Sequence, residues 1–291
     1  MSQQRSPEGL ARLAQETLAI CERGTYVAPS GRTVRIGDAV QRAIAGTVLF
    51  RPGGMYMPKW PRVMEAAGPR MTIEVTEETT GAAARRVAKE SPAHVVALNF
   101  ASAKNPGGGF LRGTTAQEED LARCSALYPC LLPQRVYYEA NRASLDAGAL
   151  YTDHLIYSPD VPFFRDERLN FLEEPFLVSM VTAPAPNAGA ELARDPGAGP
   201  RIREAMERRA ELVLRVMAAQ GHRVALLGAW GCGVFRNDPA QVAAIFAALL
   251  GGRYRHAFYR VVFPVYDKSP GQVTLRAFRD ALQAQSVESK S

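Results

Sequence analysis

Two short segments combine residue types that could carry out chemistry on a polar ligand. Gly107 to Gly109 form a run of three glycines, and a spacer of seven residues separates them from Gln117, Glu118 and Glu119. Consecutive glycines let the backbone approach a ligand closely and present several N–H groups to an anion or to sugar hydroxyls. Adjacent side chains on a helix point about 100° apart, so one carboxylate can hold a substrate while the other reaches the reacting bond.

A carboxyl group in such a place is a candidate general acid. A neighbouring negative charge and partial burial raise a carboxyl pKa toward the range that is useful for proton donation. The Gln-Glu-Glu triplet also fits a simpler role, because an acidic first turn complements the dipole of any helix. Taken alone, the triplet leaves both interpretations open.

A second glycine-rich segment, GAWGCGVF, covers residues 228–235. It does not have the G-x-G-x-x-G spacing at the start of a helix, and the chain contains no G-x-x-x-x-G-K-[ST] sequence. A P-loop nucleotide hydrolase and a dinucleotide-dependent dehydrogenase are therefore not supported. The segment is either a ligand loop or a pair of glycine turns without a ligand.

Both glycine-rich segments follow predicted strands. From Met71 onward strand and helix patterns alternate, and the nearly all-apolar run HVVALNFA at residues 94–101 predicts a strand that is buried on both faces. RVALLGAW at residues 223–230 predicts another strand. Further strands are expected at 71–75, 154–158, 175–183 and 257–266, and helices at 79–90, 117–132, 200–220 and 239–250.

This alternation predicts a three-layer α/β/α domain with a mixed or mostly parallel central sheet. In open sheets of this kind, ligands bind outside the carboxyl ends of the strands. Because both glycine-rich segments follow strands, we expect them to converge on one crevice.

Residues 1–70 have a different pattern and are interpreted as a mainly helical accessory region, packed on the domain formed by residues 71–291. Serine before proline at the start of an apolar helical face is typical of a helix N-terminus, and a Pro-Ser-Gly sequence between short β-type runs is typical of a hairpin. The expected elements are a helix from Ser6-Pro7 to about Glu22, a hairpin around Pro29-Ser30-Gly31, a helix over 37–46, and a loop or boundary over 51–62.

Composition excludes several classes of protein. The 291 residues are 47% hydrophobic and 22% charged, with no apolar run long enough to cross a bilayer. The first residues do not have the pattern of a secretory signal, which predicts a cytoplasmic protein. The net charge of +6 suits an acidic ligand, but basic and acidic residues are interspersed and no nucleic-acid-binding motif occurs. The scattered cysteines predict buried reduced thiols rather than a zinc site.

Together, the two motifs resemble a known family. Gly107-Gly108-Gly109, the seven-residue spacer and Gln117-Glu118-Glu119 match the GGG-x(6–8)-QEE signature of poly(ADP-ribose) glycohydrolases, the catalytic branch of the macrodomain superfamily. Gly231-Cys232-Gly233-Val234-Phe235 is similar to the second ligand loop of that family. The N-terminal extension resembles the compact bacterial-type enzymes. Over about residues 71–291, the resemblance implies an ADP-ribose-binding macrodomain that hydrolyses the ribose–ribose O-glycosidic bonds of poly(ADP-ribose).

The resemblance also implies roles for individual residues. Glu119 would be the general acid and base, Glu118 would hydrogen-bond the distal ribose, and Gln117 would support that geometry. Asn105 and the three glycines would shape the pocket around the ribose and the diphosphate. In the second loop, backbone N–H groups would hold the diphosphate and an aromatic ring would pack against the nucleotide; the residues are Gly231, Cys232, Gly233, Val234 and Phe235.

Two assignments stay open within this scheme. The adenine contact falls near the end of the strand at residues 71–75, where Glu77 and Thr79 are both candidates. Phe235 also fits the simpler role of an ordinary core aromatic residue.

The reaction that the resemblance implies requires no metal and no cofactor. The expected partners are poly(ADP-ribose), ADP-ribose and poly(ADP-ribosyl)ated proteins, with no membrane and no specific nucleic acid. The main alternative is a non-catalytic ADP-ribose-binding reader, which would have no use for the Gln-Glu-Glu triplet. A protein that associates with DNA or RNA through a basic surface is a third interpretation.

Overall fold

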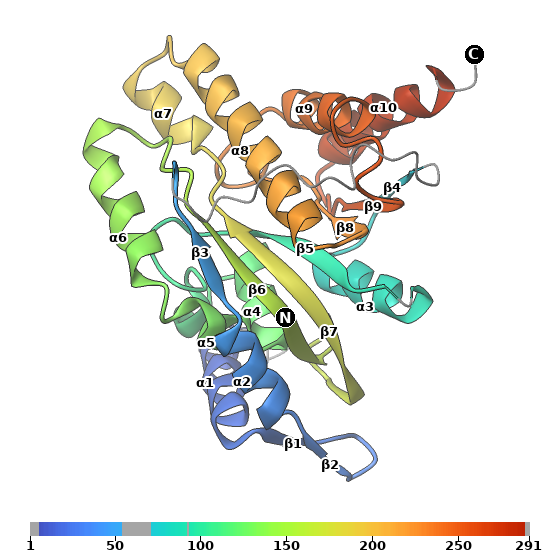
Figure 1. The fold of residues 1–291 in the computed structure, drawn as a ribbon. Helices are drawn as coiled ribbons and strands as arrows, with labels where there is room; N and C mark the ends of the chain where they lie inside the picture. The colour runs from blue at the N-terminus through green and yellow to red at the C-terminus, as the bar shows by residue number, and fades with distance from the viewer. Residues whose placement is uncertain (1–5, 54–70, 92, 289–291) are drawn as a thin grey trace.

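A seven-stranded sheet forms the centre of the protein, and helices pack on both of its faces (Figure 1). The computed structural model describes residues 6–53, 71–91 and 93–288. The strand order across the sheet is β3-β6-β7-β5-β8-β9-β4. The strands are β3 (Val48–Phe50), β6 (Leu155–Arg165), β7 (Phe171–Ala183), β5 (Val95–Phe100), β8 (Val224–Leu226), β9 (Arg260–Pro264) and β4 (Thr72–Thr76).

The sheet contains both parallel and antiparallel pairs. β7, β5, β8, β9 and β4 run parallel to one another, whereas β6 is antiparallel to β7, and β3 is antiparallel to β6. The carboxyl ends of the five parallel strands therefore meet at one edge, where β5 lies directly beside β8. The predicted three-layer α/β/α fold with a mixed sheet is confirmed.

Two hydrophobic cores lie between the sheet and the helices, one on each face of the sheet. Val95 and Ala97 of β5 belong to one core, and Val96 and Leu98 belong to the other, because successive side chains of a strand point to opposite faces. The first core includes side chains of α1 (Pro7–Arg23), α2 (Gly37–Ala45), α3 (Thr80–Glu90), α4 (Gln117–Cys124), α5 (Leu127–Leu131) and α6 (Arg135–Ala143). The second core includes side chains of α8 (Gly199–Ala219), α9 (Pro239–Gly251) and α10 (Val273–Glu288).

The N-terminal region is joined to the sheet. α1 begins after Ser6, whose side-chain oxygen accepts a hydrogen bond from Gly9 N (3.1 Å), as the capping pattern predicted. The expected hairpin, β1 (Thr25–Val27) with β2 (Thr33–Arg35), and the expected α2 follow. β3 then pairs with β6 and forms one edge of the sheet. The division into residues 1–70 and 71–291 stays a prediction, and the first part supplies a strand to the sheet of the second.

Some elements differ from the prediction. The run at residues 117–132 divides into α4 and α5, because Ser125 is extended (φ −147°, ψ 178°) and forms a bridge with Phe163 of β6. The elements β3, α6, α7 (Ala188–Arg194) and α10 were not predicted. The expected loop or boundary at residues 51–62 falls mostly outside the described residues.

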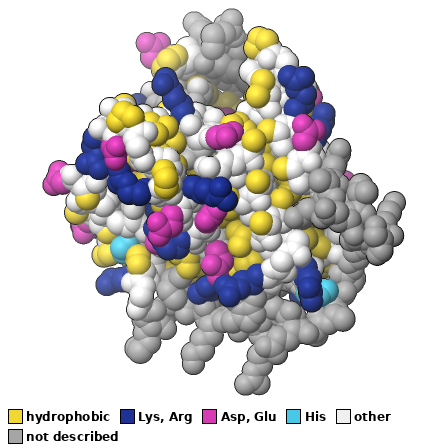
Figure 2. Space-filling view, turned by 90° about the horizontal axis from the view of Figure 1, so that it is seen from above, with side chains coloured by type: hydrophobic (Ala, Val, Ile, Leu, Met, Phe, Trp, Pro, Cys, Tyr) yellow, Lys and Arg dark blue, Asp and Glu magenta, His cyan; other side chains and the backbone are white. Residues whose placement is uncertain are grey.

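Charges of both signs share the surface that is seen from above in Figure 2. Basic and acidic side chains lie close together there, with hydrophobic side chains between them. Within the described ranges, no helix combines the length and the apolar character needed to cross a bilayer.

Candidate active site

The glycine-rich loop after β5 is a tight turn that approaches two carboxylates. Gly107 and Gly108 have φ of +62° and +60°, a region in which an L side chain is strained. A hydrogen bond from Gly108 N to Asn105 O (3.0 Å) closes the turn. A Cβ atom on Gly108 would lie 3.0 Å from Glu119 Cδ and 3.2 Å from Glu118 Oε2. Glycine is therefore required here by both the backbone conformation and the available space.

Glu118 and Glu119 lie in the first turn of α4 and are buried, with only 2% and 6% of their surface exposed. Glu118 Oε1 accepts a hydrogen bond from Asn99 Nδ2 (3.1 Å), and its Oε2 accepts one from Ser102 N (2.7 Å). Glu119 Oε1 accepts a hydrogen bond from Gly109 N (2.8 Å). Burying two carboxylates is costly unless partners hold them. The triplet is therefore more than an exposed acidic turn that complements a helix dipole.

Burial raises the pKa of Glu118 from its ordinary value of 4.5 to about 8. The hydrogen bonds from Ser102 N and Asn99 Nδ2 oppose this rise in pKa, and the negative charge of Glu119 adds to it. Glu118 is therefore mostly protonated at neutral pH. The sequence predicted a raised carboxyl pKa somewhere in this pair, and the structure assigns it to Glu118.

Gln117 fastens the start of α4 to the sheet. Its Oε1 accepts a hydrogen bond from Phe100 N (2.9 Å), and its Nε2 donates to Leu98 O (2.8 Å) and to Thr80 Oγ1 (3.1 Å). Both ends of the side-chain amide are thus engaged by β5 and α3. This geometry agrees with a supporting role, in which Gln117 sets the position of the two glutamates that follow it.

The second glycine-rich loop follows β8 and lies beside the first. A Cβ atom on Gly228 would lie 2.9 Å from Phe100 Cζ at the end of β5. Gly231 has φ of +76°, and its carbonyl accepts hydrogen bonds from Asn237 N (3.1 Å) and Asn237 Nδ2 (3.0 Å). Cys232 N donates to Ala229 O (3.2 Å) within the loop. The two loops thus follow the carboxyl ends of neighbouring strands, and their convergence on one crevice stays a prediction.

Several N–H groups of this loop are available to a ligand. Among the described residues, the backbone N–H groups of Gly231, Gly233 and Val234 have no acceptor. The Val234 side chain is 83% exposed, so this part of the loop faces outward. The N–H of Cys232 closes the turn that presents its neighbours, and the place of Cys232 in a ligand loop stays a prediction.

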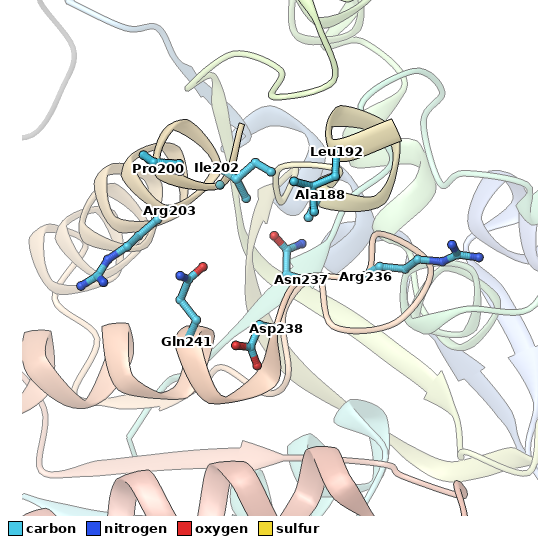
Figure 3. A pocket seen from close by; sticks show the side chains of 10 residues that line it. Ala188, Leu192, Pro200, Ile202, Arg203, Arg236, Asn237, Asp238 and Gln241 are labelled. Atoms are coloured by element: carbon cyan, nitrogen blue, oxygen red, sulfur yellow. The ribbon is translucent and has the colours of Figure 1, made fainter. Parts of the chain in front are cut away.

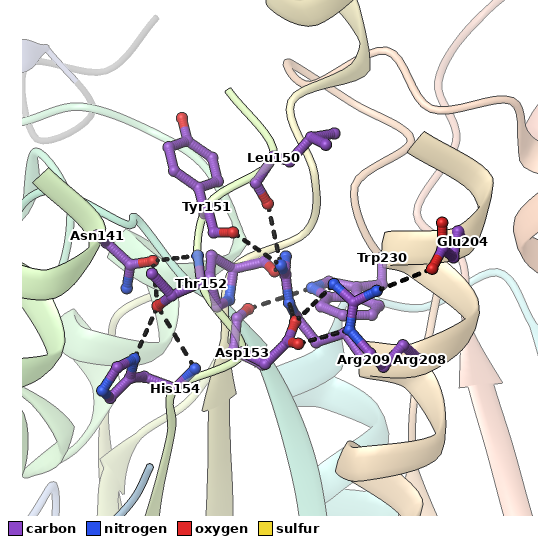
Figure 4. Close-up of polar contacts among 12 residues, drawn as sticks. Asn141, Leu150, Tyr151, Thr152, Asp153, His154, Glu204, Arg208, Arg209 and Trp230 are labelled. Carbon is purple, nitrogen blue, oxygen red and sulfur yellow. Dashed lines mark hydrogen bonds and ion pairs between the residues drawn. The ribbon is translucent and has the colours of Figure 1, made fainter. Parts of the chain in front are cut away.

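Phe235 pairs with an aromatic residue that the sequence did not indicate. Its ring lies 5.9 Å from the ring of Tyr151, centroid to centroid, and it also packs against the second core. Tyr151 has φ of +61°. Figure 4 shows how Arg209, fully buried on α8, holds this segment: it donates to Leu150 O (3.0 Å), Tyr151 O (3.3 Å) and Asp153 Oδ1 (3.1 Å). The strained backbone at Tyr151 is thus held by a buried cation.

Three residues of this site were missed at the sequence level, although two of them left a signal. Asn99 is a polar residue within an otherwise apolar strand, and Arg209 falls on the apolar face of α8, seven residues after the buried Ile202. A polar or charged residue at a buried position requires specific partners. Tyr151 left no signal, because its position depends on contacts with distant parts of the chain.

The two adenine candidates have partners within the protein. The Thr79 side chain caps α3 by accepting a hydrogen bond from Ala82 N (3.2 Å), and Glu77 lies 3.9 Å from Lys268 Nζ. Cys21, Cys124 and Cys130 are buried free thiols as predicted, whereas Cys232 is partly exposed. In the described part of the chain, no three His, Cys, Asp or Glu side chains cluster as metal ligands would.

Comparisons with known proteins agree with this geometry. The family model described as microbial-type PARG, catalytic domain, matches residues 14–166. A poly(ADP-ribose) glycohydrolase (PARG) from Thermomonospora curvata, bound to the inhibitor ADP-HPD, is 48% identical with a TM-score of 0.85 over 94% of this chain and 99% of that chain. A PARG from Deinococcus radiodurans, in complex with ADP-ribose, is 48% identical with a TM-score of 0.75 over 84% of this chain and 97% of that chain.

A comparison with curated proteins found no match. The family model nevertheless covers just over half of the chain, and the two solved enzymes match most of its length at nearly one identical residue in two. The resemblance of the two sequence motifs is thereby confirmed, and the chain belongs to the microbial-type poly(ADP-ribose) glycohydrolase family.

Proposed function

We propose that the protein hydrolyses the ribose–ribose O-glycosidic bonds of poly(ADP-ribose) and releases ADP-ribose, with one glutamate as general acid and base. The observation that carries this function is the buried pair of carboxylates packed against the glycine loop, at the carboxyl ends of the parallel strands. A protein that only bound ADP-ribose would gain nothing from burying two adjacent carboxylates, which is costly. Family membership supports the same reaction.

Glu119 is the proposed general acid and base. Gly109 N holds its Oε1, whereas its Oε2 accepts no hydrogen bond from the described residues and is not fully buried. Glu118 differs, because protein donors occupy both of its oxygens. A group that transfers protons must reach the reacting atom with an unoccupied oxygen, and Glu119 has one.

Glu118 is proposed to hydrogen-bond the distal ribose while holding a proton of its own. With a pKa of about 8, it is mostly neutral at pH 7 and can donate its O–H to a ribose hydroxyl. Gln117, fixed by its three hydrogen bonds, keeps both carboxyl groups in place.

The reaction then has two halves. In the first, Glu119 gives a proton to the 2′-oxygen of the leaving unit as the bond between that oxygen and the anomeric carbon of the distal ribose breaks. In the second, the Glu119 carboxylate takes a proton from water as the water oxygen bonds to the anomeric carbon. The products are ADP-ribose and a chain end with a free 2′-hydroxyl, and Glu119 regains its proton.

The glycine loops are proposed to hold the rest of the ligand. Asn105 and the turn from Gly107 to Gly109 shape the pocket around the distal ribose. The N–H groups of Gly231, Gly233 and Val234 bind the diphosphate, since successive backbone N–H groups form a cradle for anions. A fixed diphosphate beside the anomeric carbon stabilises positive charge as it develops there.

The proposed roles of Phe235 and Cys232 follow from their contacts. Phe235 lies against the nucleotide with Tyr151 behind it. Cys232 closes the diphosphate loop. Poly(ADP-ribosyl)ated proteins are the proposed carriers of the substrate, in the cytoplasm, without a membrane or a specific nucleic acid as a partner.

The test is incubation with poly(ADP-ribose) without added metal, followed by chromatography for free ADP-ribose. We expect release by the wild type and a loss of at least about 100-fold in Glu119→Gln, because general acid–base catalysis supplies ~10²–10⁴ in rate. Glu139→Gln, an exposed carboxylate on α6, is the control. Binding of ADP-ribose without release by the wild type would instead make the protein a reader.

A further inference from the structure

Two cations that the proposed mechanism does not use lie beside the first glycine loop. Lys104 directly precedes Asn105 and is exposed. Arg142, which is exposed in the last turn of α6, donates a hydrogen bond from Nη1 to Lys104 O (2.6 Å). This contact fixes the guanidinium group against the loop. Two residues with positive charge are therefore in contact at one place on the surface.

Hydrogen bonds connect this place to the buried carboxylates. Ser102 Oγ accepts hydrogen bonds from Lys104 N (3.2 Å) and from Asn105 N (3.2 Å). The backbone N–H of the same serine donates to Glu118 Oε2 (2.7 Å). Ser102 thus joins the turn that begins at Lys104 to the carboxyl group that is proposed to bind the distal ribose. The two cations therefore border the proposed ribose site and do not lie on a distant face.

No described carboxylate neutralises the two cations. Neither Lys104 nor Arg142 forms an ion pair within the part of the chain that the structure describes. Arg194 of α7 and Arg201 of α8, by contrast, both lie 3.3 Å from Glu191 Oε1. Guanidinium and ammonium groups bind phosphate oxygens through charge-assisted hydrogen bonds. The two cations therefore fit a ligand that brings phosphate groups to this side of the loop.

The chemistry of the substrate decides which phosphates come to this side. On the distal ribose, the anomeric carbon and the carbon that carries the diphosphate lie on opposite sides of the ring oxygen. The leaving unit therefore extends away from the diphosphate of the released unit, which is proposed to lie on the loop after β8. Figure 1 shows α6 near the β3 edge of the sheet, and β5 separates that edge from β8. The leaving unit thus extends toward Lys104 and Arg142.

We propose that Lys104 and Arg142 bind the diphosphate of the leaving ADP-ribose unit, the unit that carries the 2′-oxygen of the scissile bond. The inference rests on the proposed function, which places the distal ribose at Asn105 and the glycine turn. Free ADP-ribose has no leaving unit and does not contact the two cations. They therefore strengthen the binding of polymer but not of product, which limits inhibition by released ADP-ribose.

The test compares ADP-ribose with its dimer, which is the shortest chain that has a leaving unit. Both Kd values are measured by calorimetry in the Glu119→Gln background, so that the dimer is not consumed. We expect Lys104→Ala and Arg142→Ala each to raise the Kd for the dimer about 3- to 5-fold, as losing an exposed ion pair does, and to leave the Kd for ADP-ribose unchanged. Arg142→Lys, which keeps the charge, should retain most of the affinity for the dimer.

Lys89→Ala and Arg168→Ala are the matched controls. Both residues are exposed cations without an ion pair in the described ranges, and both lie at the opposite edge of the sheet. Lys89 is in the last turn of α3, which leads into β5, and Arg168 is in the connection between β6 and β7. Each control should leave the Kd values for ADP-ribose and for the dimer unchanged.

Arg236 marks the rival position for the leaving unit. It directly follows the second loop, and its N–H donates to Gly233 O (3.0 Å). Figure 3 shows its guanidinium directed away from the pocket between α7, α8 and the start of α9. If Arg236→Ala weakened binding of the dimer alone while Lys104→Ala did not, the leaving unit would pass over the second loop and the proposal would be wrong.

Two further results would overturn the proposal. The first is a Kd for the dimer that is the same in Lys104→Ala and Lys89→Ala. The second is an equal rise of the Kd for ADP-ribose and for the dimer in Lys104→Ala, because Lys104 would then serve the released unit. Lys104→Ala keeps the backbone contacts of the loop, so a change in Kd reports on the side chain. Because binding needs no hydrolysis, the measurement separates failure of this site from failure of the proposed activity.

Discussion

The buried carboxyl of Glu118 should make the protein less stable as the pH rises, and Glu118→Gln should remove that effect. The pKa of Glu118 is about 8 in the folded protein against an ordinary value of 4.5, so the folded state keeps the proton where the unfolded state has lost it. Because the unfolded state binds fewer protons in this window, the free energy of unfolding falls between pH 4.5 and about pH 8. At ~1.4 kcal/mol per pKa unit, the loss is on the order of 5 kcal/mol.

The measurement is urea unfolding of the wild type and of Glu118→Gln at about pH 5, 7 and 9. We expect the variant to gain stability relative to the wild type at each step, because a neutral amide has no charged form to desolvate. Glu139→Gln controls for the loss of one exposed carboxylate. A stability difference between wild type and Glu118→Gln that stays constant across this range would refute the reasoning, since Glu118 would then titrate alike in the folded and unfolded states.

Two further predictions concern the glycine loop and the buried cation. Gly108→Ala should lower kcat/KM for the polymer at least about 100-fold, because its Cβ would displace the Glu119 carboxylate; Gly81→Ala, in open space on α3, should leave turnover unchanged. Arg209→Met should lower the free energy of unfolding by ~3–5 kcal/mol, as breaking a buried ion pair does. Arg208→Met, which removes a half-exposed partner of the same aspartate, should cost about 1 kcal/mol or less in the same urea titration. Equal losses in the two arginine variants would contradict the assignment of the buried role to Arg209.

Local patterns predicted the parts of the fold that depend on neighbouring residues. The apolar run at residues 94–101 became the doubly buried β5 because its length and composition suit no exposed element. The cap at Ser6 was readable because a capping side chain bonds to a backbone N–H three residues later. β3 was missed because three residues carry no periodicity, and α4 ends at Ser125 because of a bridge to the distant Phe163.

In the site, too, features set by residues close in sequence were predictable, and features set by distant contacts were not. The glycine run and the Gln-Glu-Glu triplet could be assigned to one site because a short spacer links the two motifs in sequence, whereas the close approach of Gly108 to Glu119 came from the structure. The pairing of Tyr151 with Phe235, and the hydrogen bonds of Arg209, join parts of the chain that are far apart. The raised pKa of Glu118 depends on its burial, and burial is set by the folded surroundings rather than by residue type.

The edge strand β3 has a consequence for the order of events during synthesis. Its partners Leu155 to Tyr157 follow more than 100 residues later in the chain. At ~5–20 residues per second, translation of the intervening segment takes roughly 5 to 20 s. During that time the nascent Val48–Phe50 segment cannot complete its edge of the sheet. The Val48–Phe50 segment therefore waits until residues 155–157 have been made, an interval in which a chaperone could recognise its exposed apolar side chains.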